Sequence, residues 1–246
     1  MFFKRKIFII ICLLLFALPV GFASDDANLN QTLSTNEMDY AEVLSSEDDD
    51  YIHIYVNASA ASPGNGTQEA PYQNLSSVNY NFTNNTVLHI ADGYYNYNNS
   101  GNTSMLIFSN VKFIGESTEN TTLDFSGNGI FAFIEYGSNI YFENIRLFNT
   151  PVNLISYNGQ RQYGGKFEGV NVTFENSKSI ASNGVNYIGG AISCSGELNL
   201  TNCIFKNNSA DLGGAIFALI GGEITNCTFI NNTAKEDGGA IFTPYN

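Results

Sequence analysis

Basic residues are scarce in this sequence. Its 246 residues include ten Lys and Arg against 23 Asp and Glu, which gives a formal charge of −13. Because nucleic-acid affinity depends largely on contacts of Lys and Arg with phosphates, this balance argues against nucleic acid and anionic lipid as partners. Solubility outside the cell is the simplest explanation of the acidity.

Cysteine is scarce too, and the common metal-binding spacings are missing. Cys12 lies in an N-terminal apolar run, which leaves Cys194, Cys203 and Cys227 in the rest of the chain. This odd number argues against a closed disulfide framework. The paired Cys-x-x-Cys pattern of zinc sites does not occur.

The apolar run at the N-terminus is too short for an ordinary membrane span, which needs roughly 20 residues. It covers Ile7 to Leu18, follows the basic triplet Lys4-Arg5-Lys6, and precedes small residues at Gly21 and Ala23. These features predict a secretory signal peptide over residues 1–23, with an uncleaved N-terminal anchor as the alternative. The mature chain would keep seven basic and 23 acidic residues, a formal charge of −16, and no membrane span.

Residues 24–50 differ in composition from the residues that follow. Nine acidic residues and no basic ones lie between Asp25 and Asp50. Such a segment buries too little apolar surface to offset the entropy of ordering it. We predict a disordered acidic spacer, either a solvated tail or a charged stalk, and a folded part over residues 51–246.

No stretch of the folded part keeps a helical period for three turns. Short β-rich runs alternate instead with Gly, Asn and Ser, and five of them are Ile52–Val56, Thr86–Ile90, Met105–Phe108, Val111–Ile114 and Ile140–Phe142. Alternation of apolar and polar residues predicts strands. The abundant Asn and Gly are turn residues that tolerate a positive φ.

Internal repeats occupy the C-terminal part of the chain. Gly-Gly-Ala-Ile begins at Gly189, Gly213 and Gly238, and residues 189–212 share 11 of 24 positions with residues 213–236. The stretches from Asn144 and from Asn171 are degenerate versions of the same unit. True self-similarity at a short period predicts a stack of repeated structural units.

Positions within the repeat indicate what the unit is. Cys203 and Phe205 return as Cys227 and Phe229, whereas the residues between them change. This alternation predicts strands with Cys and Phe toward a core. Helical repeats are longer, and leucine-rich repeats need more Leu. We predict an all-β, single-stranded, right-handed parallel β-helix of roughly eight coils, each with three short strands.

Stacked coils would place equivalent residues above one another. We expect Phe205 on Phe229, and Asn207 on Asn231 in a hydrogen-bonded ladder. Cys203 and Cys227 would lie within disulfide range, but free core thiols are preferred because parallel stacking does not aim the sulfurs at each other. The Gly-Gly pair would form a tight corner before the next strand.

The unit Cys-x-Phe-x-Asn-Asn-[Ser/Thr]-Ala followed by Gly-Gly-Ala-Ile, at 203–216 and 227–241, resembles the repeats of chlamydial polymorphic outer-membrane proteins. The same repeats occur in adhesin-like surface proteins of methanogenic archaea. The upstream phrases at 54–57, 64–72, 88–95 and 113–124 resemble secreted pectate-lyase-like β-helices. The resemblance covers nearly all of residues 51–246 and implies the pectin-lyase-like fold and a cell-surface or adhesive role.

Catalytic constellations are missing. Glycoside hydrolysis usually needs two facing carboxylates. The aspartates of the folded part are Asp92, Asp124, Asp211 and Asp237. They form no local cluster, and a structural role in turns is the preferred interpretation of all four.

A lyase of this fold would use a basic residue beside calcium held by acidic residues. The mid-chain candidates are Arg146, Arg161 and Lys166, and no carboxylate cluster lies near them in sequence. The Arg161-Gln162-Tyr163 stretch would line a sugar groove, with Tyr157 and Tyr163 as stacking platforms, but a loop that lengthens one coil is the simpler interpretation. His53 and His89 stand on separate runs, so we predict no catalytic, cofactor-binding or metal-binding residue and no cofactor.

Sequons for N-glycosylation are numerous, as expected for a chain rich in Asn, Ser and Thr. They include Asn57, Asn81, Asn84, Asn171, Asn207 and Asn231.

The sequence therefore predicts a non-enzymatic, adhesin-like protein, secreted or at the cell surface. Its partner would be an unknown receptor, a glycan or an envelope polymer. A carbohydrate-active β-helix enzyme, either a lyase or a glycosidase, is the alternative. The chain stops nine residues into a new repeat, so we expect a truncated member, with a naturally short secreted form as the other interpretation.

Overall fold

The computed structural model describes residues 50–61, 64–97, 103–126, 130–135, 137–156, 165–179 and 188–244. The predicted signal peptide, over 1–23, and the predicted spacer up to residue 49 lie outside these ranges. Within them the chain is almost entirely β-structure. The 3-10 helix η1 (Leu75–Ser77) is the one helix described, and no described helix is long and apolar enough to cross a membrane.

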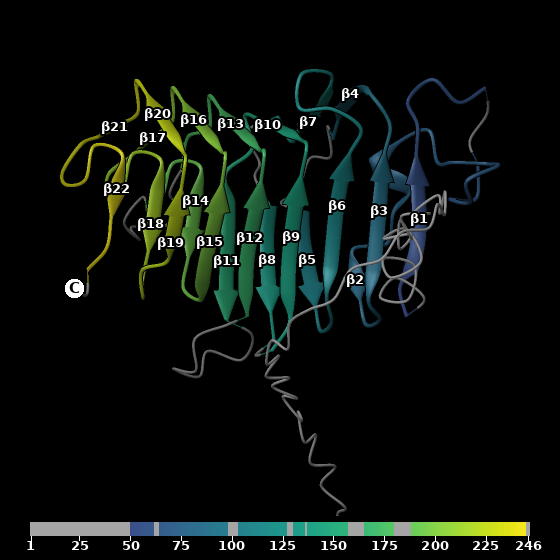
Figure 1. The fold of residues 1–246 in the computed structure, drawn as a ribbon, viewed down its shortest axis with the longest axis horizontal. Coiled ribbons are helices and arrows are strands. Elements are labelled where there is room, and N and C mark those ends of the chain that lie inside the picture. Colours follow the sequence, from purple (N-terminus) through teal and green to yellow (C-terminus); the bar gives the residue numbers. More distant parts are fainter. Residues whose placement is uncertain are drawn as a thin grey trace, which may run out of the picture.

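Three parallel sheets form the walls of the molecule (Figure 1). Sheet 1 contains β1 (Ile52–Val56), β3 (Thr86–Ile90), β6 (Val111–Gly115), β9 (Asn139–Glu143), β12 (Lys166–Val170), β15 (Glu197–Thr201) and β19 (Glu223–Thr225). Sheet 2 contains β4 (Gly93–Asn96), β7 (Thr121–Asp124), β10 (Arg146–Phe148), β13 (Thr173–Glu175), β16 (Ile204–Lys206) and β20 (Thr228–Ile230). Sheet 3 contains β2 (Asn81–Phe82), β5 (Thr103–Ile107), β8 (Ile130–Ile134), β11 (Val152–Ser156), β14 (Ile192–Cys194), β18 (Ile216–Ala218) and β22 (Ile241–Phe242). A small extra sheet pairs β17 (Ser209–Ala210) with β21 (Thr233–Ala234).

The chain visits the three sheets in turn. For example, β6, β7 and β8 form one coil, and β9, β10 and β11 form the next. Each strand pairs in parallel with its equivalent in the neighbouring coil, which confirms the predicted β-solenoid. Sheets 1 and 3 hold seven strands each in the described residues. The right-handed sense and the roughly eight coils remain predictions.

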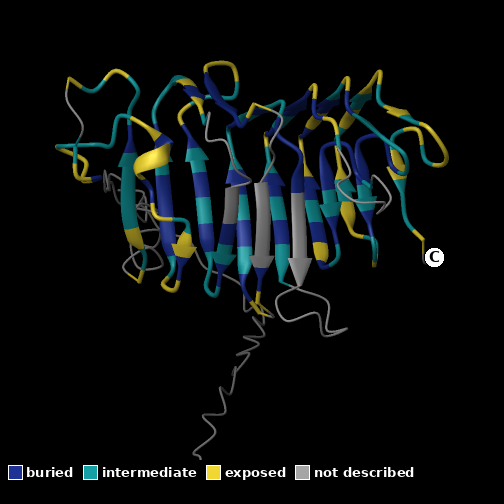
Figure 2. Ribbon diagram, turned by 180° about the vertical axis from the view of Figure 1, so that it is seen from behind, coloured by how far each residue is buried: buried dark blue, intermediate teal, exposed yellow. Residues whose placement is uncertain are grey.

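Alternation of side chains produces the core. Along β6, β9 and β12, every second residue is buried and the others are half exposed, as expected for strands with one face inward (Figure 2). The predicted Phe stack is confirmed. The rings of Phe205 and Phe229 lie 4.9 Å apart, and Phe174 continues the stack at 4.6 Å from Phe205. Their neighbours Ile204 and Lys206 point away from the core.

Asparagine shapes the corners on either side of sheet 2. Each of β10, β13, β16 and β20 has an Asn with positive φ shortly before it and another directly after it. These residues are Asn144, Asn149, Asn171, Asn176, Asn202, Asn207, Asn226 and Asn231, with φ between 50° and 57°. Asn tolerates this left-handed conformation better than most residues, which explains its abundance.

A buried polar ladder runs beside these corners. Asn208 is fully buried, donates from Nδ2 to the carbonyl of Phe174 at 3.0 Å, and accepts from the Ser177 backbone N–H at 2.9 Å. In the following coil, Asn232 Oδ1 accepts from the backbone N–H and from Nδ2 of Asn208. In the preceding coil, the Thr150 N–H donates to the Ser177 hydroxyl. The predicted column through Asn207 and Asn231 also carries a hydrogen bond, since Asn207 donates at 3.3 Å to Asn176, its equivalent in the preceding coil. The buried ladder through the second Asn of each pair was not predicted.

The Gly-Gly corners match their prediction. Gly189, Gly213 and Gly238 have φ between 63° and 66°. A Cβ at Gly213 would lie 2.1 Å from the carbonyl oxygen of Ile216, so the corner admits no side chain. The Ala and Ile that follow Gly189 and Gly213 are buried, and these Ile residues begin β14 and β18.

The three described cysteines are free thiols. Cys203 is buried and Cys227 half-buried, and the Cys203 backbone N–H donates to the Cys227 sulfur at 3.4 Å. The two residues therefore stack as predicted, and free thiols are confirmed over the disulfide.

Candidate binding face

Two columns of side chains cover the outer face of sheet 1. They arise because the parallel register places outward residues of successive coils side by side. The first column contains His53, Val87, Lys112, Tyr141, Glu168, Asn199 and Glu223, of which Val87 is buried. The second contains Tyr55, His89, Ile114, Glu143, Val170, Thr201 and Thr225.

Two carboxylates lie on either side of Tyr141 in this face. The Tyr141 hydroxyl donates to Glu143 Oε2 at 3.0 Å, and Glu168 lies opposite Tyr141 on β12. Burial, with the nearby Glu143 and Glu168 charges, raises the pKa of Tyr141. Lys166 Nζ lies 2.5 Å from Glu168 Oε1, and Asn139 donates to Glu168 Oε2 at 2.6 Å.

The environment of Glu168 favours its charged form. Burial raises the pKa of this carboxyl, but the contacts with Lys166 and Asn139 outweigh burial, so the pKa lies below the usual glutamate range. Glu168 therefore stays ionised at neutral pH. A general acid needs a raised pKa, so this position is unsuited to that role.

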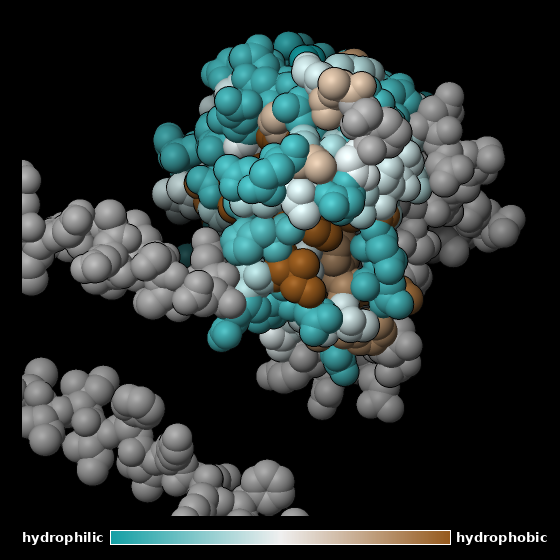
Figure 3. Space-filling view, turned by 90° about the vertical axis from the view of Figure 1, so that its right-hand side faces the viewer, coloured by the Kyte–Doolittle hydropathy of each residue, from teal (hydrophilic) through white to brown (hydrophobic). Residues whose placement is uncertain are grey.

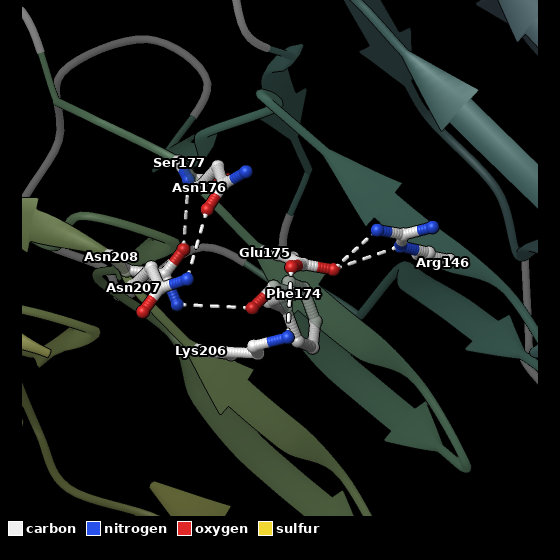
Figure 4. A network of polar contacts seen from close by, with 8 residues as sticks. All are labelled: Arg146, Phe174, Glu175, Asn176, Ser177, Lys206, Asn207 and Asn208. Atoms are coloured by element: carbon white, nitrogen blue, oxygen red, sulfur yellow. Dashed lines mark hydrogen bonds and ion pairs between the residues drawn. The ribbon is translucent and has the colours of Figure 1, made fainter. Parts of the chain in front are cut away.

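A second charged group crosses three strands of sheet 2 (Figure 4). Arg146 Nε and Nη2 both donate to Glu175 Oε2, at 3.0 and 2.5 Å, and Lys206 Nζ lies 3.2 Å from Glu175 Oε1. Only 12% of the Glu175 side chain is exposed. Burial raises the pKa of Glu175, but the hydrogen bonds and charges of Arg146 and Lys206 outweigh burial and lower it. The group joins β10, β13 and β16.

The predicted turn roles of Asp92 and Asp124 agree with the hydrogen bonds of the structure. Asp92 accepts from Ser117 Oγ at 2.8 Å and Thr121 Oγ1 at 3.0 Å, which closes the turn after β6. The Ser117 hydrogen bond is the main cause of the lowered pKa of Asp92. Asp124 is buried, accepts from the Ser126 backbone N–H at 2.6 Å, and accepts from the Tyr94 hydroxyl.

Asp211 and Asp237 lie before Gly-Gly corners, as predicted. The carbonyl of Asp237 accepts from the Gly213 N–H at 3.0 Å. Asp211 lies 3.8 Å from Lys235 Nζ, and both line an open cavity of about 580 Å³ beside β17 and β21. The structure brings none of the four aspartates together as a facing pair.

The fold brings the basic residues and histidines into contacts that were not predicted from the sequence. Arg146 and Lys166 each contact carboxylates, which come from neighbouring positions across coils as well as along the chain. His53 and His89 are not isolated, because His53 Nδ1 lies 2.8 Å from His89 Nε2. Among the residues described, no group of three or more His, Cys, Asp or Glu could hold a metal ion. Arg161, Tyr157 and Tyr163 lie outside the described residues.

Sequence reasoning missed Glu143, Glu168 and Glu175. Local spacing reveals only the contacts of Glu143 with Tyr141 and of Glu168 with Lys166. It does not reveal the contacts across coils, since Tyr141 and Glu168 are 27 residues apart and Arg146 and Glu175 are 29 apart. The register of the degenerate repeats was the available signal. Aligning the stretches from Asn144 and Asn171 places β10 beside β13 and brings Arg146 near Glu175.

Most predicted sequons are accessible. Asn81, Asn84, Asn171, Asn207 and Asn231 are exposed, and Asn57 is half-buried.

Comparison with known families finds a similarity in the C-terminal repeats. A model of the Chlamydia polymorphic membrane protein repeat matches residues 202–219 and 226–244. These two repeats are similar to that family. The matched residues include strands β16 and β20 and the Gly213 and Gly238 corners, which are the elements that close a coil. No curated protein and no solved structure matches the chain.

Proposed function

We propose that the chain is a non-enzymatic, adhesin-like protein of the cell surface, exported by its N-terminal segment. The observation that carries this proposal is the match to a polymorphic membrane protein repeat inside a β-solenoid. Residues of successive coils form outer columns along sheet 1, and such a surface suits an extended receptor, a glycan or an envelope polymer. Membership among adhesin-like proteins of methanogenic archaea is part of the proposal.

A structural role of the charged groups supports the non-enzymatic half of the proposal. Arg146, Glu175 and Lys206 neutralise one another across coils. Glu168 contacts Lys166 on its own strand and Asn139 of the preceding coil. Charges held in this way tie neighbouring coils together and are poorly placed to exchange protons with a substrate.

The test measures adhesion and turnover on the same preparation. The purified full chain is labelled and added to cells or isolated cell envelopes, with the heat-unfolded chain as control. We expect saturable binding by the folded chain and no release of products from any polysaccharide. Binding equal to that of the unfolded chain would contradict the adhesive role.

A carbohydrate-active enzyme is the second candidate, favoured by one observation. Glu143 and Glu168 both raise the pKa of Tyr141, so the two carboxylates lie near each other on the outer face of sheet 1. Glycosidases use a pair of carboxylates. In that case polysaccharides would be degraded, and Glu143→Gln and Glu168→Gln would each abolish degradation. Turnover that both variants lose would replace the adhesin proposal with this one.

A further inference from the structure

We propose that a cavity at the β1 end of sheet 1 is a binding site for a neutral saccharide. This inference rests on the proposed surface role and names the chemistry of the ligand. The cavity is open to solvent and has a volume of about 420 Å³. Small-molecule sites usually have volumes of roughly 300–1,000 Å³, so it has the size of a specific site.

A returning segment of chain builds the cavity. Residues 64–72 lie beside the end of β1, where the Tyr55 N–H donates to the Gly66 carbonyl at 2.8 Å and the Tyr72 N–H donates to the Tyr55 carbonyl at 2.9 Å. These hydrogen bonds place Gln68 and Pro71 beside the C-terminal ends of β1, β3 and β6. Seen from the β1 end, the surface is largely hydrophilic around a small apolar cluster (Figure 3). The backbone hydrogen bonds fix the shape of the cavity before any ligand arrives.

Aromatic rings form a rigid part of the wall. Tyr55 and His89 both line the cavity, and their rings stack at 4.6 Å with an angle of 14° between their planes. His53, on β1, also contacts His89, with 2.8 Å between the ring nitrogens. Ile114 and Pro71 add apolar surface. Rigid rings and apolar carbons suit the carbon face of a sugar, because little side-chain entropy is lost on contact.

Polar groups at the rim suit hydroxyls. Gln68 makes no side-chain hydrogen bond within the described chain. Asn57 uses Oδ1 to accept from the Ser59 N–H at 2.8 Å, which leaves its amide hydrogens for a ligand. Glu116 Oε2 accepts from the Asp92 N–H at 3.0 Å, and its other oxygen faces no described donor. Sugar hydroxyls both donate and accept, and so they match this mixture of amides and a carboxylate.

The charge of the site selects a neutral ligand. Glu116 lines the cavity and Asp92 lies beside it, whereas no Lys or Arg is among the described lining residues. The whole chain carries a formal charge of −13. A uronate or a sulfated sugar would be repelled, so neutral hexoses or N-acetylhexosamines fit better.

The test uses the full chain from a host without N-glycosylation, because the sequon at Asn57 lies in the cavity. An array of neutral and uronate-containing glycans identifies a ligand, and titration calorimetry measures its affinity. Gln68→Ala and Glu116→Gln are the test variants. Glu236→Gln, an exposed substitution after β21 (Thr233–Ala234), far along the stack of coils from β1 and outside both columns of sheet 1, is the matched control. Melting curves check that all three variants fold.

We expect neutral glycans to bind, each test variant to weaken binding at least about tenfold, and the control to bind as the parent does. A preference for uronates, a blank array, or equal affinities of test and control variants would overturn the inference. If the parent adheres to envelopes while the neutral array is blank, only this inference fails. If the parent binds neutral glycans yet adheres to no surface, the proposed function fails and the site stands.

Discussion

Glu175 shows how one residue joins three coils. It receives Arg146 from one side and Lys206 from the other, on strands that are consecutive in sheet 2. Its carboxylate is largely buried, whereas both cations remain partly in water. A partly buried carboxylate with two partners contributes more than an exposed pair, whose usual value is about 0–1 kcal/mol.

Replacing Glu175 by Gln should lower the free energy of unfolding by about 1–2 kcal/mol at neutral pH, because two cations lose their partner. The folded pKa of Glu175 is lowered, so its contribution is present above the ordinary glutamate pKa of about 4.3 and disappears as the pH falls through the folded value. Urea unfolding of both proteins at several pH values measures the difference. A gap between them that stays constant with pH would contradict this account.

The thiols differ in their predicted reactivity. Burial raises the pKa of Cys194 to about 12 and that of Cys203 to about 12, so neither forms thiolate near neutral pH. Cys227 is only half-buried. Iodoacetamide at about pH 8 should modify Cys227 first, as mass spectrometry of the native protein would detect. In guanidinium chloride all three should react alike, and equal rates in the native protein would refute the prediction.

At the scale of the element, the Gly-Gly corner decides how a coil turns. Gly213→Ala should destabilise the protein by about 3 kcal/mol or more, because a left-handed Ala costs about 1–2 kcal/mol and its Cβ meets the Ile216 carbonyl. Gly221→Ala is the matched control. Gly221 also has a positive φ, of 82°, but a Cβ there meets nothing within 4 Å. Thermal unfolding of both variants should separate the cost of the left-handed φ, which both share, from the cost of the contact with the Ile216 carbonyl. Equal losses of stability in the two variants would show that the backbone shifts to relieve this contact.

The Asn-Asn pair offers a second comparison of neighbouring positions. Asn208→Ala leaves the Ser177 N–H and the Phe174 carbonyl without their buried partner, so we expect a loss of about 2–4 kcal/mol. Asn207→Ala, at an exposed corner, should cost about 1–2 kcal/mol for its left-handed φ. Denaturant unfolding ranks the two. A larger loss for Asn207→Ala would mean that the exposed column of Asn side chains stabilises the stack more than the buried ladder does.

The limits of sequence reasoning are clearest within these elements. Cys203 and Phe205 alternate with variable neighbours, and that pattern alone predicted which residues face the core. The Asn pair gave no such contrast, since Asn207 and Asn208 both repeat and only backbone conformation decides which one turns inward. The pairs across coils, such as Tyr141 with Glu168, depend on loop lengths that change from coil to coil.

For the whole molecule, periodicity predicted the architecture better than the site. The GGAI spacing and the strand-like runs predicted three strands per coil and a common core, and both are confirmed. The cavity at β1 was not predicted, because it needs residues 64–72 to lie beside the end of β1 and meet His89 and Glu116 from two further coils. A resemblance between repeats predicts the fold even where segments such as residues 64–72 are added between strands. The cavity depends on the conformation of that added segment, which the repeats do not encode.

The charge of the whole molecule leads to a last prediction. Arg146, Lys166, Lys206 and Lys235 already face carboxylates, so the rest of the acidic surface repels itself. Raising NaCl from about 10 mM to about 150 mM shortens the Debye length to about 8 Å and screens this repulsion more than it weakens the close, half-buried pairs. The melting temperature at neutral pH should therefore rise with salt. Near pH 5, closer to the isoelectric point of about 4.3, the same salt step should have a smaller effect. A fall in melting temperature with salt at neutral pH would mean that the ion pairs between coils outweigh the net repulsion.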